Sequence, residues 1–177
     1  DMILGSYYLT IDRAGEKGEG HVFRDMDEVE MAYEAGNVGL HAPIKVRVTR
    51  EINGEKVTRL VDATYGRLIF NKFIPQHLGY VDRTDPERIC DLEIMFTCGK
   101  KQIGDIINRT IKLHGSNVTA EVLDHIKATG YKYSTLASIS IAVSDVEVSP
   151  KKDELIAESD KRVETIRKHF LRGELTE

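Results

Sequence analysis

Glycine-rich segments are the first residues along the chain whose spacing suggests chemistry. Gly15, Gly18 and Gly20 stand close together, and Gly99 begins the run Gly-Lys-Lys at 99–101. A phosphate-binding loop ends in Gly-Lys-Ser/Thr, or has the pattern G-x-G-x-x-G between a strand and a helix. Neither pattern is present. We therefore interpret 15–20 as a turn and 99–101 as the start of a helix with two solvated lysines.

Histidines, cysteines and carboxylates form no recognisable metal or catalytic motif. No two of the six histidines have the i, i+4 spacing that places two ligands on one helix face. Cys90 and Cys98 match no common zinc spacing, and they indicate partly buried thiols in a reducing compartment. No Gly-x-Ser-x-Gly elbow anchors a hydrolase. Asp153 and Glu154 suit the first turn of a helix. A small stand-alone enzyme is the least favoured function.

A basic grouping is formed by Lys45, Arg47 and Arg50 on one strand region, with Arg67 following. Two interpretations stay open. The grouping is a face that meets RNA, nucleotide phosphates or an acidic partner, or it is the solvated outer face of an antiparallel sheet. The net charge of −4 and pI of about 5.9 argue against a free-standing nucleic-acid binder, which is usually basic.

The bulk composition indicates a globular chain with a real core. It has 177 residues, of which 41% are hydrophobic and 31% are charged, enough for one domain or two small ones. No apolar run approaches the roughly 20 residues of a membrane span, so we expect no membrane association. The start at Asp1-Met2 lacks a signal peptide, and we expect the chain to be an internal piece of a longer protein.

The first half is expected to be mainly strand. Alternation of Ile44, Val46 and Val48 with polar residues predicts a strand, and Asn53-Gly54 suits a type I′ turn in a hairpin over 44–62. The other predicted elements are strands at 3–11 and 92–96, a helix at 27–35 ended by Gly36 or Asn37, and a short buried element at 68–70.

The second half is expected to be helical. Apolar spacing predicts one helix at 100–114 closed by Gly115 and another around 118–126 closed by Gly130. Residues 139–143 form a short extended run. We predict a last helix over 149–172, capped by Ser149 and ended near Gly173.

That last helix carries a narrow apolar seam. Ile156, Val163, Ile166 and Phe170 lie at near-heptad spacing on a charged helix, as in one arm of a coiled coil. No return arm follows before Glu177. The predicted fold is α+β, with a mainly antiparallel strand region followed by helices and ending in one arm of a projecting helical hairpin.

Four blocks, at 1–10, 15–20, 40–47 and 64–71, stand in fixed order. Together they resemble the stretch of the bacterial RNA polymerase beta-prime subunit that follows its catalytic aspartate loop. Later segments extend the resemblance over nearly the whole chain; they lie at 99–104, 129–133, 139–146 and 149–176.

This resemblance implies a pore-like strand-rich region at 1–98 and a funnel-like helical region at 99–177, with the first rim helix at 149–172. In the family these parts line the secondary channel, through which nucleotides enter and the RNA 3′ end is extruded. Transcript-cleavage factors dock on the rim helices. Implied partners are the beta, alpha, omega and sigma subunits, and DNA and RNA through the full complex, in the cytoplasm at the nucleoid.

Two departures from the family limit what this chain does alone. The Asn-Ala-Asp-Phe-Asp-Gly-Asp loop that holds Mg²⁺ is absent, so we expect no catalytic or metal residue here, and no activity in isolation. The full polymerase would hold Mg²⁺ with a segment outside this chain. Leu136 and Ser138 stand where many relatives carry Arg and Gly, so this chain lacks the charge that those relatives have at this position.

The candidate sites follow from these blocks. Arg67 and Asn71 are the candidate pore residues, for which a structural role is the stronger interpretation. Candidate factor-docking residues lie on the charged face of the last helix; they are Glu158, Lys161, Arg162 and Glu164. The alternative function is an independent coiled-coil interaction module without catalysis.

Overall fold

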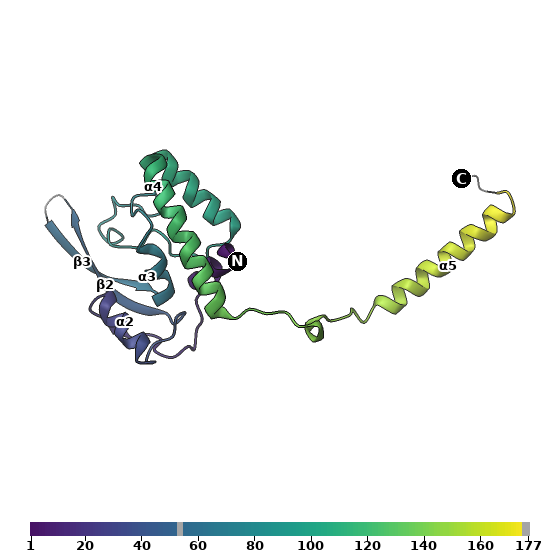
Figure 1. Ribbon diagram of the computed structural model, residues 1–177, viewed down its shortest axis with the longest axis horizontal. Helices are drawn as coiled ribbons and strands as arrows, with labels where there is room; N and C mark the ends of the chain where they lie inside the picture. The colour runs from purple at the N-terminus through teal and green to yellow at the C-terminus, as the bar shows by residue number, and fades with distance from the viewer. Residues whose placement is uncertain (53–54, 175–177) are drawn as a thin grey trace. The chain divides into compact units, whose positions relative to one another are not determined.

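The computed structural model describes residues 1–52 and 55–174 and confirms an α+β fold. The chain divides into two compact units, Asp1–Ile139 and a second that begins at Ser140. In chain order the elements are α1 (Met2–Thr10), β1 (Val22–Phe23), α2 (Met26–Glu34), β2 (Ile44–Ile52), β3 (Glu55–Ala63), α3 (Tyr65–Asn71), α4 (Lys100–Ala137), the 3₁₀ turn η1 (Val143–Asp145) and α5 (Lys152–Leu171) (Figure 1).

The predicted hairpin is confirmed. β2 and β3 pair antiparallel from Ile44↔Ala63 to Ile52↔Glu55, and β1 adds to β2 in parallel. The predicted turn residues Asn53-Gly54 lie outside the described residues. Ile44 and Val46 are buried while Lys45 and Arg47 are exposed, because successive side chains of a strand point to opposite faces.

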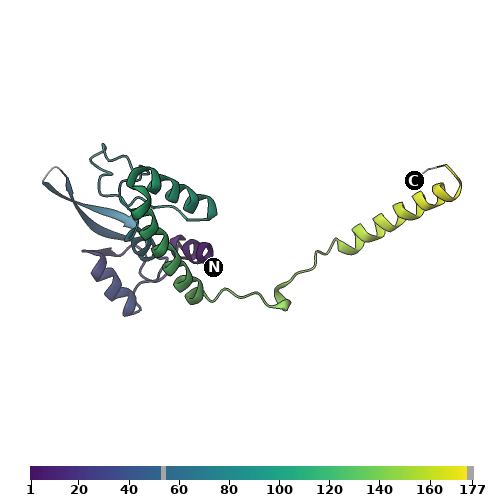
Figure 2. The same ribbon diagram turned by 45° about the horizontal axis from the view of Figure 1, so that its top comes forward.

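One apolar core holds the first unit together. Each of its helices and the sheet contribute buried side chains, including Leu9, Val29, Val46, Val61, Leu68, Ile106 and Val122. Figures 1 and 2 show α4 packed on one side of this unit and the β2–β3 hairpin extending from the other. The predicted helix at 27–35 and the buried element at 68–70 are confirmed as α2 and α3.

The strand predicted at 3–11 is wrong, because these residues form α1. A short, continuously apolar run cannot be assigned to strand or buried helix from its periodicity. The helix is favoured by tertiary packing: Leu9 is fully buried, and α1 makes extensive contact with α4. Ser6 and Thr10 add side-chain hydrogen bonds to the carbonyls one turn back, at Met2 and Ser6, of 2.9 and 2.8 Å.

Two arms joined at Gly115 make up α4. The first arm begins after Gly99 and confirms the predicted helix, and Gly115 breaks it with φ of +78°. Gly130 does not end the second arm, contrary to the prediction, since the helix continues to Ala137. Gly130 instead lets α1 approach closely: a Cβ there would lie 2.6 Å from the Met2 carbonyl oxygen.

The strand predicted at 92–96 is also wrong. This segment has no strand pairing in the described part of the chain, and both Glu93 and Ile94 are buried. Its backbone is held by side chains from α3 and the loop after it. Strict alternation of buried and exposed residues is therefore not found here. The run at 139–143 is likewise unpaired and exposed.

In the second unit, α5 confirms the predicted last helix with a shifted start. Lys151 occupies the N-cap position and makes no side-chain capping bond, so the predicted Ser149 cap is wrong. The predicted end is confirmed: Gly173 has φ of +71°, and the N–H of Glu174 donates to the His169 carbonyl at 3.1 Å.

No helix in the described ranges is long and apolar enough to cross a membrane.

Candidate functional site

Arg67 joins the end of α1 to the start of α3. Thr64 caps α3 by accepting a hydrogen bond from the Arg67 N–H at 3.1 Å. The Arg67 Nε donates to the Thr10 carbonyl at 2.9 Å, and its terminal nitrogen lies 3.4 Å from an Asp12 carboxylate oxygen. Only 11% of this side chain is exposed. Two nitrogens of the guanidinium thus face the protein's own backbone and Asp12.

Asn71 connects α3 to the 92–98 segment with its whole amide group. Its Nδ2 donates to the carbonyls of Arg67 and Ile94, both at 2.8 Å. Its Oδ1 accepts from the Ile94 N–H at 2.9 Å and from Gln76 at 3.2 Å. The side chain is buried. Asn71 therefore replaces a strand partner for Ile94 and positions the loop that follows.

A buried ion pair stabilises the same loop and was not anticipated from the sequence. The Glu93 side chain is fully buried, pairs with Arg83 at 3.0 Å and accepts from the Tyr80 N–H at 2.9 Å. Arg83 also donates to the carbonyls of Ile89 and Asp91. The only sequence signal was a lone acid within the apolar run at 92–96. Burial of such a charge requires the partners it has here.

The basic grouping predicted on β2 is divided by the sheet. Lys45 and Arg47 lie on the exposed face, and Lys45 is 3.4 Å from Asp62 on β3. Arg50 points the other way and donates to Gln76 at 2.8 Å and to the Asp91 carbonyl at 3.2 Å. Burial lowers the pKa of Arg50, with Arg83 adding to the effect. A single cationic face containing Arg50 is therefore wrong.

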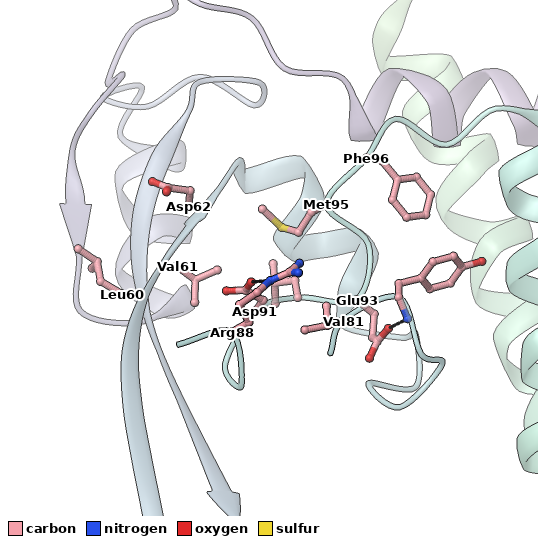
Figure 3. Close-up of a pocket in the computed structure, with 11 residues that line it drawn as sticks. Leu60, Val61, Asp62, Val81, Arg88, Asp91, Glu93, Met95 and Phe96 are labelled. Carbon is pink, nitrogen blue, oxygen red and sulfur yellow. Dashed lines mark hydrogen bonds and ion pairs between the residues drawn. The ribbon is translucent and has the colours of Figure 1, made fainter. Parts of the chain in front are cut away.

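Two adjoining hollows lie beside β3, and the larger one faces the 80–96 loop. The larger, of about 420 Å³, is lined by Val61, Tyr80, Arg88, Asp91, Glu93, Met95 and Phe96 among others (Figure 3). The smaller, of about 290 Å³, lies beside Arg67 and shares Asp62 and Met95 with the first. The structure thus places Arg67 at the smaller hollow. Asn71 lies under the 80–96 loop, which forms a wall of the larger hollow.

The carboxylates around these hollows do not fit a Mg²⁺ site. Asp91 is 3.3 Å from Arg88, and Glu93 is paired with Arg83. A hard cation needs several oxygen ligands that are not already neutralised. Across residues 1–52 and 55–174, no three potential ligands of the His, Cys, Asp or Glu type gather in one place.

The two cysteines are buried and free. Burial raises the pKa of the Cys98 thiol to about 12, so the nucleophilic thiolate is disfavoured. The Cys98 N–H donates to the Thr10 hydroxyl at 2.8 Å, and the Cys90 thiol donates to the Val57 carbonyl at 3.5 Å. Both residues are fully buried in the core, whereas the sequence predicted partly buried thiols.

Comparison with known proteins identifies the family. Residues 1–146 match the family described as RNA polymerase Rpb1, domain 3. The chain belongs to this family.

Curated relatives extend the similarity to both ends. The chain is 49% identical over 173 residues to the DNA-directed RNA polymerase subunit beta' of Acetivibrio thermocellus, and 50% identical over 177 residues to that of Clostridium botulinum strain Okra. It is 47% identical over 177 residues to the subunit from Thermoanaerobacter pseudethanolicus. These matches cover 98–100% of the chain and 15% of each relative, so the chain spans a small part of their length.

α5 lies beyond the stretch matched to the Rpb1 domain 3 family and carries the four docking candidates. All four are exposed on this one helix, and Glu158 is 3.6 Å from Arg162 one turn later. Between 48% and 61% of each seam residue is exposed; these residues are Ile156, Val163, Ile166 and Phe170. The helix therefore presents both a charged surface and a half-exposed apolar seam.

Proposed function

We propose that this chain is the pore and funnel region of the largest subunit of a bacterial DNA-directed RNA polymerase. End-to-end similarity to beta' subunits, at 47–50% identity, carries the proposal. In this role residues 1–98 shape the pore and residues 99–177 form the funnel of the secondary channel. The channel admits nucleotides and receives the extruded RNA 3′ end.

The residues around the hollows support a positioning role for the pore candidates. Arg67 and Asn71 hold α1, α3 and the 92–98 segment together through backbone carbonyls and N–H groups. We propose that they shape the channel wall by positioning this loop, without contacting nucleotide themselves. The pore wall next to them then consists of the 80–96 loop and the exposed face of the sheet.

Catalysis belongs to the full polymerase in this proposal. Mg²⁺ would be held by a segment of the full subunit outside this chain, and the chain by itself would be inactive. Its partners would be the beta, alpha, omega and sigma subunits, with DNA and RNA bound through the complex in the cytoplasm, at the nucleoid. Transcript-cleavage factors would dock on α5 through its charged residues.

A split-polymerase reconstitution tests this function. The parts of beta-prime before and after this chain are assembled with the other subunits, with and without residues 1–177. RNA extension in the presence of Mg²⁺ is then measured. We expect extension only when the chain is present. Equal extension without the chain, or failure of the chain to co-assemble, would contradict the proposal.

The exposed seam of α5 favours one second candidate, an independent coiled-coil interaction module. In that case the chain alone would form a stable complex through Ile156, Val163, Ile166 and Phe170. Sedimentation equilibrium of residues 1–177 together with the reconstitution separates the two. A stable coiled-coil complex without rescue of extension would favour the module.

A further inference from the structure

The chain between α3 and α4 has no strand or helix of its own to hold it in place. Residues 72–99 are all described, and they form only turns, bends and irregular backbone. The polar backbone groups of such a segment must find partners elsewhere in the protein. Asp91 and Glu93, in the 80–96 loop, line the larger hollow (Figure 3). The contacts that hold residues 91–93 therefore determine the shape of this hollow.

Arg50 on β2 joins the hairpin to this segment. Its Nη2 donates to Gln76 Oε1 at 2.8 Å and to the Asp91 carbonyl at 3.2 Å. Arg50 stands opposite Val57 of β3, whose carbonyl accepts from the Cys90 thiol at 3.5 Å. A thiol is a weak donor, whereas hydrogen bonds from a charged group are stronger than neutral ones. Arg50 therefore makes the stronger of these polar contacts between the hairpin and the loop.

Gln76 connects Arg50 to α3 and to the 92–98 segment. Its Oε1 also accepts from the Glu93 N–H at 3.2 Å, and its Nε2 donates to Asn71 Oδ1 at 3.2 Å. Asn71 in turn bonds to both backbone groups of Ile94. Because a guanidinium can only donate, Arg50 holds the Gln76 amide with its oxygen toward β2 and its nitrogen toward Asn71. One side chain of the hairpin thus orients the amide on which residues 93 and 94 depend.

A second guanidinium lies beside that of Arg50. Arg83 donates to the same Asp91 carbonyl at 2.7 Å and pairs with the buried Glu93 at 3.0 Å. Burial lowers the pKa of Arg50, and Arg83 lowers it further, since two like charges repel where little water screens them. A cation held inward under these conditions is stabilised by its acceptors, which are Gln76 and the Asp91 carbonyl. This arrangement favours a specific role for Arg50 over that of a solvated surface charge.

We propose that Arg50 is a positioning residue, through which the β2–β3 hairpin fixes the 91–93 part of the pore wall. Arg50 acts through Gln76 and the Asp91 carbonyl, and of these residues only Asp91 lines the larger hollow. This inference rests on the proposed function, in which the 80–96 loop belongs to the wall of the channel that admits nucleotides. It adds the hairpin to the elements that position this wall.

Hydrogen exchange on the assembled polymerase tests the contact itself. With this sequence in place in the full subunit, we expect Arg50→Met to make the Glu93 and Ile94 amides exchange about tenfold faster. The matched control is Arg59→Met, which removes the same charge from an exposed position on the same face of the hairpin. It should leave both amides unchanged. In a Gln76→Met background, Arg50→Met should add less than about twofold, because Gln76 no longer connects Arg50 to these amides.

Nucleotide kinetics of the same polymerase separate positioning from a loss of stability. Arg50→Met is expected to raise the KM for the incoming nucleotide about threefold with kcat unchanged, because nucleotide access, and not the chemical step, depends on the pore wall. A purely structural defect would instead reduce the fraction of assembled enzyme. That loss would lower the rate at every nucleotide concentration and leave KM as it is. Arg59→Met should match the wild type in both kcat and KM.

Three results would overturn the positioning role of Arg50. Unchanged exchange at Glu93 and Ile94 in an assembled, active Arg50→Met polymerase would contradict it and leave the proposed function standing. Equal acceleration by Arg59→Met would indicate a general effect of charge. Faster exchange with an unchanged KM would show that the loop positioned by Arg50 does not control nucleotide access. Failure of the wild-type chain to assemble would instead reject the proposed function, and the role of Arg50 in the pore wall with it.

Discussion

At the residue scale, Asn71 is the most connected of the predicted site residues. Its amide satisfies both the N–H and the carbonyl of Ile94, which lies in a buried segment that pairs with none of the described strands. A buried backbone group without a hydrogen bond is strongly unfavourable. The 64–71 block identified Asn71 as a candidate in the sequence. Its partner Ile94 lies 23 residues further along the chain, and no local pattern indicated this contact.

Replacing Asn71 should therefore affect stability before it affects any channel. We expect Asn71→Ala to lower the free energy of unfolding by about 2–4 kcal/mol, because two buried groups of Ile94 lose their partner. Lys72→Ala, at the exposed neighbouring position, should change it by less than about 0.5 kcal/mol. Urea unfolding of residues 1–177 measures both. Equally small effects of Asn71→Ala and Lys72→Ala would contradict the positioning role of Asn71.

His41 links the fold to pH. It is 1% exposed, and its ring meets Tyr8 edge-on with centroids 4.6 Å apart. Burial lowers the pKa of His41; Arg13 lowers it further and Glu16 opposes the shift. Since the unfolded value is about 6.5, the unfolded chain takes up a proton first as the pH falls. The stability associated with neutral His41 is present above about pH 6.5 and decreases below it.

His41→Leu should therefore make the stability less dependent on pH. The loss of unfolding free energy between about pH 7.5 and pH 5 is expected to be smaller in His41→Leu than in the wild type. His114→Gln removes an exposed histidine of α4 and is expected to behave like the wild type. Urea titrations at the two pH values provide the comparison. A parallel pH dependence in all three chains would contradict the assignment.

At the element scale, the crossing of α1 and α4 depends on two glycines. A Cβ on Gly5 would lie 1.8 Å from the Gly130 carbonyl oxygen, and one on Gly130 would lie 2.6 Å from that of Met2. Both contacts are with backbone atoms, which cannot rotate away. Sequence spacing assigned Gly130 to a helix end, the commonest place for glycine, because a close helix crossing has no local signature.

Alanine substitutions separate these two roles of glycine. Gly130→Ala is expected to destabilise the chain by about 1–3 kcal/mol through overpacking. Gly104→Ala lies in the other arm of α4, where nothing is within 4 Å of the added Cβ. It should stabilise the chain by about 0.5–1 kcal/mol, since alanine favours helix. Thermal unfolding measures both effects. If both substitutions stabilised the chain, the close crossing of α1 and α4 at Gly130 would be contradicted.

At the scale of the whole molecule, α5 is the proposed contact with regulatory factors. The double variant Glu158→Lys, Arg162→Glu reverses an exposed ion pair of α5. We expect about tenfold weaker binding of a transcript-cleavage factor to the assembled polymerase, with the difference diminishing at high salt. Because exposed pairs contribute little to stability, the unfolding free energy should change by less than about 0.5 kcal/mol.

The matched control reverses another exposed pair. Asp124 and Lys127 on α4 are 2.7 Å apart, and Asp124→Lys, Lys127→Asp should leave factor binding unchanged. Titration of labelled factor at two salt concentrations compares the variants. Equal weakening by both would indicate a general charge effect, and no weakening by either would remove α5 as the docking surface.

By itself the sequence determined the elements whose periodicity is unambiguous: the β2–β3 hairpin, α2, the first arm of α4, and α5 with its Gly173 end. It also determined the family through ordered blocks. These features are local, because alternation, apolar spacing and turn residues act over a few positions.

Only the tertiary structure decided the rest. α1 is a helix because α4 covers it, the 92–96 segment is irregular because Asn71 and Gln76 hydrogen-bond to its backbone, and Arg50 turns inward to the Asp91 carbonyl. Each of these outcomes depends on a partner distant in the chain. A buried polar group takes its conformation from the partner that satisfies it, and local sequence does not name that partner.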